Sequence, residues 1–288
     1  MKVRYPNNAG SWYEGSAEML RKQLEAGCFL HSLGPGEVPQ PPSGGGERSI
    51  LGLLCPHAGY TYSGPIAAHS YAALGRDGRP DTLVILGPNH TGMGSGVSMM
   101  AEGVWRTPLG DVPVNTEVAK AIQAASSYVD LDDKAHLYEH SIELQLPFLK
   151  HIFGEGFDMV PIAMLLQDLE VSRDVGEAVG KALKGRNAVI IASSDMTHYE
   201  AQSSAEKKDQ AAINAILSLD EGALFETVER LGITMCGVGP AAVMLVAAKA
   251  LGAGEAVLLK YATSGDITGD RSGVVGYCSM AVKKKAEA

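Results

Sequence analysis

The sequence predicts a layered α/β fold in one domain, residues 1–288, with helices on both faces of a central, mostly parallel or mixed sheet. Apolar runs rich in β-branched residues alternate along the chain with segments of helical period, as in layered α/β proteins. The apolar runs have no polar side, which is expected of strands that are covered on both faces. No change in composition divides the chain, so a single domain is expected.

The strands and helices are expected in the following order. β-branched apolar runs predict strands at 50–55, 82–87, 159–164, 188–193, 256–262 and 273–282, and GVSMM, 96–100, predicts a shorter one. Helical period predicts helices at 16–27, 65–74, 116–125, 141–153, 168–184, 204–218, 221–232 and 239–251. Residues 33–48, LGPGEVPQPPSGGGER, hold too much Pro and Gly for either element, so we expect a flexible loop there.

Composition excludes several classes of protein. The 288 residues are 45% hydrophobic and carry a net charge of −9, and the only basic run is the short tail at 283–285, so no nucleic-acid partner is expected. The polar N-terminus lacks the apolar core of a signal peptide, and the longest apolar run, VGPAAVMLVAAKALG, is broken by Lys249, so no membrane partner is expected. Four scattered cysteines without a CxxC pair favour a reduced, cytoplasmic setting. The sequence leaves the oligomeric state open.

Polar side chains follow several predicted strands at the point where each strand ends. In open α/β sheets ligands bind beyond the carboxyl ends of the strands, so these side chains are candidates for one pocket. A glycine-rich turn before a predicted helix and the YEH segment before another add further candidates. The set is His57, Asn89, His90, Ser194, Asp195, His198, Glu139, His140 and Cys236.

Each candidate also has a structural interpretation. Asp195 with Ser194 could cap the next helix, and His140 could stand at a helix start with Ser141 as the cap. The other histidines are interpreted as satisfied loop residues, with His151 in an amphipathic helix and His136 in a loop rich in charge, and the other cysteines as small buried hydrophobes; the full set is His31, His69, His136, His151, Cys28, Cys55 and Cys278.

Two ligand sets are open if a metal binds. Two histidines with a carboxylate favour non-haem iron(II), whereas two histidines with a cysteine and water resemble catalytic zinc. Cys236 is the preferred third ligand and Asp195 the alternative.

Five ordered blocks give the chain a family resemblance: PHAGYTYSG, GPNH, EHSIELQLPFL, SSDMTHY and MCGVGP. With the early RYPNNAGSWYEG, they resemble the signature blocks of the Memo family, which includes eukaryotic mediators of cell motility and prokaryotic members called AmmeMemoRadiSam system protein B. The resemblance covers nearly the whole chain and implies the fold of class III, LigB-type extradiol dioxygenases.

The resemblance also implies a site. The metal ligands would be His57, His90 and Cys236, with His198 as the acid/base histidine and with Asp195 and His140 lining the same pocket. Iron(II) is the first expectation, and copper or zinc are alternatives. A cysteine stands where those dioxygenases have a carboxylate, and a thiolate is softer and oxidisable.

Three functions follow as hypotheses. The first is an iron-dependent dioxygenase or other oxidoreductase acting on a catechol-like or other small aromatic substrate. The second is a non-enzymatic protein that binds a metal or a peptide and acts with radical-SAM and AMMECR-type partners. The third is zinc-dependent hydrolysis. Tyr60 and Tyr62, near the first block, are further candidates to line the substrate space.

Overall fold

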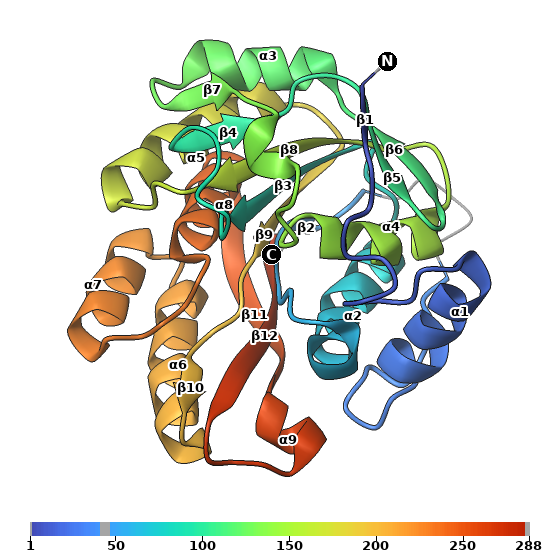
Figure 1. Ribbon diagram of the computed structural model, residues 1–288. Coiled ribbons are helices and arrows are strands. Elements are labelled where there is room, and N and C mark those ends of the chain that lie inside the picture. The colour runs from blue at the N-terminus through green and yellow to red at the C-terminus, as the bar shows by residue number, and fades with distance from the viewer. Residues whose placement is uncertain (1, 41–46, 286–288) are drawn as a thin grey trace.

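The computed structural model describes residues 2–40 and 47–285 (Figure 1). Its centre is a mixed sheet, nine-stranded within these residues. Four parallel strands lie side by side in the middle, in the order β2 (Ile50–Cys55), β9 (Ala188–Ser193), β3 (Thr82–Pro88) and β8 (Asp158–Met164). The predicted α/β class, with a mixed central sheet, is confirmed.

Antiparallel strands extend this parallel centre at both edges. Beside β2 lies β12 (Val274–Lys284), which also pairs with β11 (Ala253–Thr263) and β10 (His198–Glu200). Beside β8 lies β4 (Val97–Met99), followed by β7 (Val129–Leu131).

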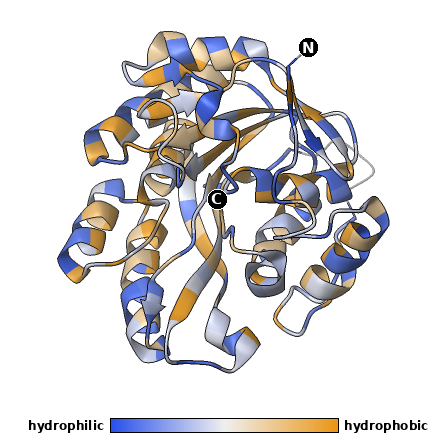
Figure 2. Ribbon diagram, viewed as in Figure 1, coloured by the Kyte–Doolittle hydropathy of each residue, from blue (hydrophilic) through white to orange (hydrophobic). Residues whose placement is uncertain are grey.

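Alternate residues of each central strand enter two separate cores. In β3, Leu83 and Ile85 face one core, whereas Val84 and Leu86 face the other. This period of two follows from the pleat of a strand, and it explains why the strands are apolar throughout (Figure 2).

Helices cover both cores, as the sequence predicts. On one face lie α1 (Ala17–Lys22), its π-helical continuation (Gln23–Phe29), α2 (Tyr60–Asp77) and α4 (Leu146–Phe153). On the other lie α3 (Thr116–Ala125), α5 (Leu169–Leu183), α6 (Gln202–Leu217), α7 (Glu221–Leu231) and α8 (Val238–Ala250). The short α9 (Ser264–Thr268) connects β11 to β12. No helix within the described residues is long and apolar enough to cross a membrane.

Five short strands escape sequence patterning because two to four residues cannot establish a period. Besides β7 and β10, these are β1 (Val3–Arg4), β5 (Val104–Thr107) and β6 (Gly110–Pro113), which form a small separate sheet. Part of the predicted loop at 33–48, residues 41–46, lies outside the described residues. The described parts of that segment contain no helix or strand.

Two predicted helix starts are wrong. Helix α2 begins at Tyr60, so Pro65 lies inside the helix and does not open it. The helix predicted from residue 141 begins at Leu146, after a 3-10 turn (Glu143–Gln145). Ser141 is not its cap, because the Ser141 hydroxyl donates to the Pro88 carbonyl.

The structural interpretation of Asp195 as a helix cap is also wrong. Asp195 is followed by strand β10, and α6 begins only at Gln202, after Ala201. The Asp195 carboxylate instead accepts a hydrogen bond from the backbone of His57.

Candidate metal centre

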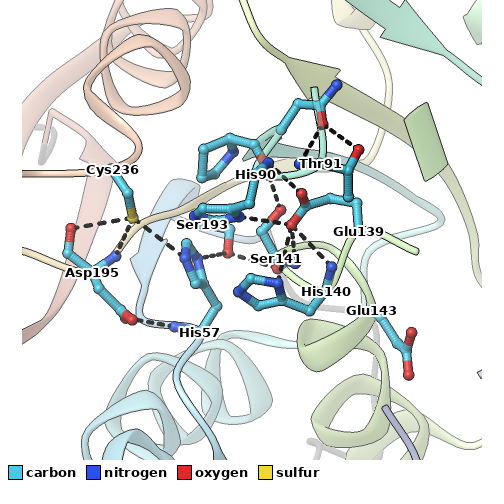
Figure 3. Close-up of polar contacts among 12 residues, drawn as sticks. His57, His90, Thr91, Glu139, His140, Ser141, Glu143, Ser193, Asp195 and Cys236 are labelled. Atoms are coloured by element: carbon cyan, nitrogen blue, oxygen red, sulfur yellow. Dashed lines mark hydrogen bonds and ion pairs between the residues drawn. The ribbon is translucent and has the colours of Figure 1, made fainter. Parts of the chain in front are cut away.

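Strands β2, β9 and β3 are parallel neighbours, so their carboxyl ends meet at one edge of the sheet. His57, Asp195 and His90 each follow one of these ends by two residues. Cys236 comes from the loop before α8. One ring nitrogen of His57, one of His90 and the sulfur of Cys236 lie within 4.8 Å of one another (Figure 3).

The loop that carries Cys236 is held tightly against the end of β9. The Cys236 Sγ lies 3.3 Å from His57 Nε2, and it accepts a hydrogen bond from the backbone N–H of Asp195 at 3.2 Å. The Gly237 N–H donates to Ser194 Oγ, and Gln167 Nε2 donates to the Cys236 carbonyl. Burial raises the pKa of the Cys236 thiol, so the free site favours the neutral thiol.

The hydrogen-bond network fixes the tautomer of His57. Its Nδ1 lies 2.7 Å from Ser193 Oγ, whose own proton goes to the Ser141 carbonyl at 2.7 Å. Gln145 Nε2 also donates to Ser193 Oγ. Because the Ser193 proton is already used, His57 Nδ1 must be the donor, and Nε2 keeps its lone pair toward Cys236. Burial, reinforced by the neighbouring histidines, lowers the pKa of His57 and keeps its ring neutral.

A buried carboxylate orients His90 in the same way. Glu139 Oε1 accepts from His90 Nδ1 at 2.9 Å and from the backbone N–H groups of His140 and Ser141, and Oε2 accepts from the His90 backbone N–H. Burial alone would raise the pKa of Glu139, but the interactions of its carboxylate with His90, with His140 and with the Ser141 N–H together outweigh burial and bring the pKa to about 2. His90 Nδ1 is therefore a donor, and its Nε2 is free to bind a metal.

The aromatic rings of the site pack against one another, with His140 stacked on His90 and the ring of His57 edge-on to both. His140 lies over His90 with ring centroids 4.5 Å apart, 5.3 Å from the ring of His57, and its other neighbour is Trp12 at 4.2 Å. Burial lowers the pKa of His140 to about 4, so it is neutral at pH 7. His140 thus packs against the rings of both His57 and His90 and against Trp12.

Asp195 and His198 lie at the side of the site. Burial raises the pKa of the Asp195 carboxyl to about 6, and the hydrogen bond from the His57 backbone opposes this rise. His198 Nδ1 lies 2.9 Å from the Thr234 carbonyl, which can only accept, so Nε2 of His198 carries the lone pair. Neither residue belongs to the group of ligand atoms formed by His57, His90 and Cys236.

The donor set fits a transition metal. Two imidazoles each donate the Nδ1 proton to an oxygen of a neighbouring side chain, which is the usual arrangement around metal-binding histidines. A thiol completes the set, and imidazole with thiolate suits iron, copper and zinc. Sequence reasoning missed the supporting residues Ser193 and Gln145. Gln145, a polar residue between two leucines in the 3-10 turn that precedes α4, was the available signal.

Most of the remaining histidines fit their structural interpretation, with one correction. His69 Nε2 bonds the Leu33 carbonyl, and His151 lies 3.6 Å from Glu25. His136, expected in a charged loop, is fully buried beside Trp105. The 3-10 turn Lys134–His136 directs this ring inward. The charged residues around His136 in the sequence gave no indication of this burial.

Comparison with solved structures supports the fold. An uncharacterized protein from Escherichia coli K12 superimposes with a TM-score of 0.56 at 13% identity, over 80% of this chain and 99% of its own. At that identity the likeness extends to the fold alone.

Comparison with protein sequences reaches further. A family model described as Memo-like protein matches residues 4–281. MEMO1 family proteins of Methanopyrus kandleri and Methanocaldococcus jannaschii are 50% and 52% identical to this chain, each over 98% of it and 99% of the relative. A third, from Methanothermobacter thermautotrophicus, is 49% identical over 96% of this chain and 99% of its own. With matches that span nearly its whole length, this chain belongs to the Memo family.

Proposed function

We propose that this chain is a non-haem metal protein in which His57, His90 and Cys236 hold one transition-metal ion, iron(II) in the first place and copper or zinc as alternatives. The observation that carries the proposal is the convergence of three ligand atoms within 4.8 Å. Two of them belong to imidazoles whose Nδ1 protons are already held. Such preorganisation of the donors lowers the cost of ordering them around an ion.

The proposed activity is that of an oxidoreductase acting on a small aromatic substrate, in the manner of a dioxygenase. A bound iron(II) ion with open positions would supply activation of dioxygen. Residues of the chain would transfer protons and keep the metal-binding histidines in position. His198 has a free Nε2 and is half-buried, so it can exchange a proton with a ligand. Asp195 holds the backbone of His57, and His140 packs against the rings of both metal-binding histidines.

The test begins with metal content. The protein is purified anaerobically without a metal-chelating tag, and bound metals are measured by mass spectrometry in the wild type, His57→Ala and Cys236→Ala. His69→Ala is the matched control, because His69 is a partly buried histidine that bonds a loop carbonyl away from the site. About one iron per chain, lost in the two site variants and kept in the control, supports the proposal. No metal in the wild type after anaerobic iron loading would overturn it.

Activity is tested separately on the loaded protein. Oxygen uptake with catechols should occur in the wild type and fall strongly in His198→Gln, which keeps its metal. Bound metal without any turnover would favour the alternative, a non-enzymatic metal or peptide binder that works with radical-SAM and AMMECR-type proteins. Stoichiometric zinc, with no requirement for oxygen, would favour hydrolysis.

A further inference from the structure

Asp209 is a fully buried carboxylate outside the group of proposed metal ligands. It belongs to α6, which packs against β10, β11 and β12 (Figure 1). Its neighbours on the core-facing side of this helix are Ala212, Ile213 and Ile216, and all of them are fully buried as well. A carboxylate in such a place is costly unless hydrogen bonds satisfy its oxygens.

Neutral donors satisfy the Asp209 carboxylate. Its Oδ1 accepts from Thr197 N at 2.9 Å and from Thr197 Oγ1 at 2.6 Å, and its Oδ2 accepts from the Tyr261 hydroxyl at 2.7 Å. Burial raises the pKa of Asp209, and the hydrogen bonds from Thr197 and Tyr261 oppose this rise. Asp209 therefore holds one residue, Thr197, by both its backbone and its side chain.

Strand β12 leaves space for this carboxylate and binds the same segment. A Cβ on Gly276 would collide with Asp209 Oδ2, so a glycine is required there. Met196 N donates to Gly276 O at 2.8 Å, and Gly276 N donates to Thr197 O at 2.9 Å. Residues 196–197 are thus held by a carboxylate of a helix and by the backbone of a strand.

The segment held by Asp209 leads to the proposed metal ligands on its N-terminal side. Asp195 comes two residues before Thr197. Its carboxylate accepts from the His57 N–H at 2.8 Å, and its own N–H donates to Cys236 Sγ at 3.2 Å. Because the backbone is continuous, a shift of Thr197 would displace Asp195 and both of these contacts.

On its C-terminal side the segment carries the proposed acid/base histidine. His198 follows Thr197 directly, and its N–H and Nδ1 bond to Thr234 at 2.7 and 2.9 Å. Tyr199 then has a left-handed backbone with φ at 59°, which is unfavourable for a bulky residue and persists only where the surroundings impose it. The place of His198 therefore depends on firm anchors on both of its sides.

We propose that Asp209 is a positioning residue of the candidate metal centre. Its hydrogen bonds to Thr197 fix the backbone on either side, which keeps Asp195 and His198 in place beside the proposed metal ligands. Tyr261 supports this arrangement by occupying the second carboxylate oxygen. The effect on turnover rests on the proposed function, whereas the fixed backbone belongs to the metal-free chain as well.

Matched variants separate the hydrogen bonds from the charge. Asp209→Asn keeps an acceptor for Thr197, and its NH₂ group can donate to the Tyr261 hydroxyl, which also accepts. Asp209→Leu has a similar shape but no acceptor, so the Thr197 N–H and hydroxyl are left buried without a partner. The control is Asp77→Leu. Asp77 holds the N–H and hydroxyl of Ser49 at 2.8 and 2.7 Å in the same manner, at the amino end of β2 and away from the centre.

The first measurement is hydrogen–deuterium exchange of the metal-free proteins. Exchange in a peptide covering 194–200 should become about tenfold faster or more in Asp209→Leu and stay within about twofold of the wild type in Asp209→Asn. Asp77→Leu should accelerate exchange at its own segment and leave 194–200 unchanged. NMR of the imidazole nitrogens reports the tautomer of His198. The Nδ1 proton should stay toward Thr234 in the wild type and in Asp209→Asn, and the tautomers should become mixed in Asp209→Leu.

The second measurement is oxygen uptake with a catechol after iron(II) loading, expressed per bound metal. The kcat of Asp209→Leu should fall about tenfold or more, because a small misplacement of a proton-transfer group is costly. Asp209→Asn and Asp77→Leu should stay within about twofold of the wild type. If Asp209→Leu does not fold, Thr197→Val takes its place. It removes only the hydroxyl bond and should change exchange and kcat in the same directions by about threefold or more.

The outcomes are separable. Wild-type exchange at 194–200 in Asp209→Leu, or an equal rise in Asp77→Leu, would overturn the inference. Asp209→Asn behaving like Asp209→Leu would overturn it as well, since the charge and not the hydrogen bonds would then matter. Full turnover in Asp209→Leu despite faster exchange would remove Asp209 from the reaction. A wild type that binds iron without turnover would instead overturn the proposed activity, and the exchange and the tautomer would still decide whether Asp209 positions His198.

Discussion

Replacement of Glu139 by glutamine should weaken metal binding although all three proposed metal ligands are kept. The Glu139 carboxylate accepts four N–H groups, three at Oε1 and one at Oε2. A glutamine has one acceptor oxygen, which should take the Oε1 position because three donors meet there. Its NH₂ group would then face the backbone N–H of His90, donor against donor.

The expected magnitude follows from these contacts. A hydrogen bond to a charged group contributes about 1.5–3 kcal/mol. Glu139→Gln removes one such bond, and the other three N–H groups then donate to a neutral oxygen instead of a charged one. Loss of an outer-shell partner typically lowers metal affinity about 10–100-fold, which corresponds to about 1.4–2.7 kcal/mol. We therefore expect iron(II) affinity to fall 10–100-fold and the metal-free protein to lose about 2 kcal/mol of unfolding free energy.

The matched control is Glu143→Gln, four residues along the same segment. Glu143 is also fully buried, but it accepts from Arg4, Asn8 and Tyr13 and makes no hydrogen bond to His90. Because the change leaves the buried Arg4 charge without its partner, it should cost about 3–5 kcal/mol of stability and leave the affinity of the folded protein unchanged.

The assay is anaerobic iron(II) titration against a competing chelator, with urea unfolding of each metal-free variant. Wild-type affinity in Glu139→Gln, or an equal loss in Glu143→Gln, would refute the reasoning. Either result would mean that the orientation of His90 does not limit metal binding.

Three further predictions concern the loop that carries Cys236, the pH dependence of stability and the N-terminal segment. A Cβ at Gly237 would lie 2.5 Å from a backbone oxygen of β9, so Gly237→Ala should displace Cys236, lower metal content and cost about 2 kcal/mol, measured by mass spectrometry and urea unfolding. Burial lowers the pKa of His136 to about 4, against about 6.5 in the unfolded chain. Only the unfolded chain binds that proton between these values, so stability should fall by up to about 3 kcal/mol as pH drops from 6.5 to 4, and urea unfolding of His136→Phe across this range should show a shallower fall. Tyr13→Phe removes a 2.8 Å hydrogen bond to the Glu143 carboxylate and should cost about 2 kcal/mol by the same method, while an unchanged midpoint would contradict the role of that bond.

Much of the fold was predictable because its signals are local. The β-branched apolar run of β3 and the helical period of α3 are properties of short segments, and α3 occurs at the predicted residues 116–125. The short strands β1, β5 and β6 were not predictable, because two to four residues establish no period and β1 pairs with the distant β5. The start of α2 was misplaced because Pro65 resembled a first helical residue, whereas the helix begins a turn earlier.

The site divides in the same way. The sequence by itself determined that His57 and His90 follow core strands, since apolar runs and their ends are readable along the chain. Only the tertiary structure decided that β9 lies between β2 and β3, which brings Asp195 beside His57. It also brought Cys236 to within 3.3 Å of His57, across 179 positions of sequence. The physical reason is that strand order and loop docking depend on how the two cores pack together, and no local period records that packing.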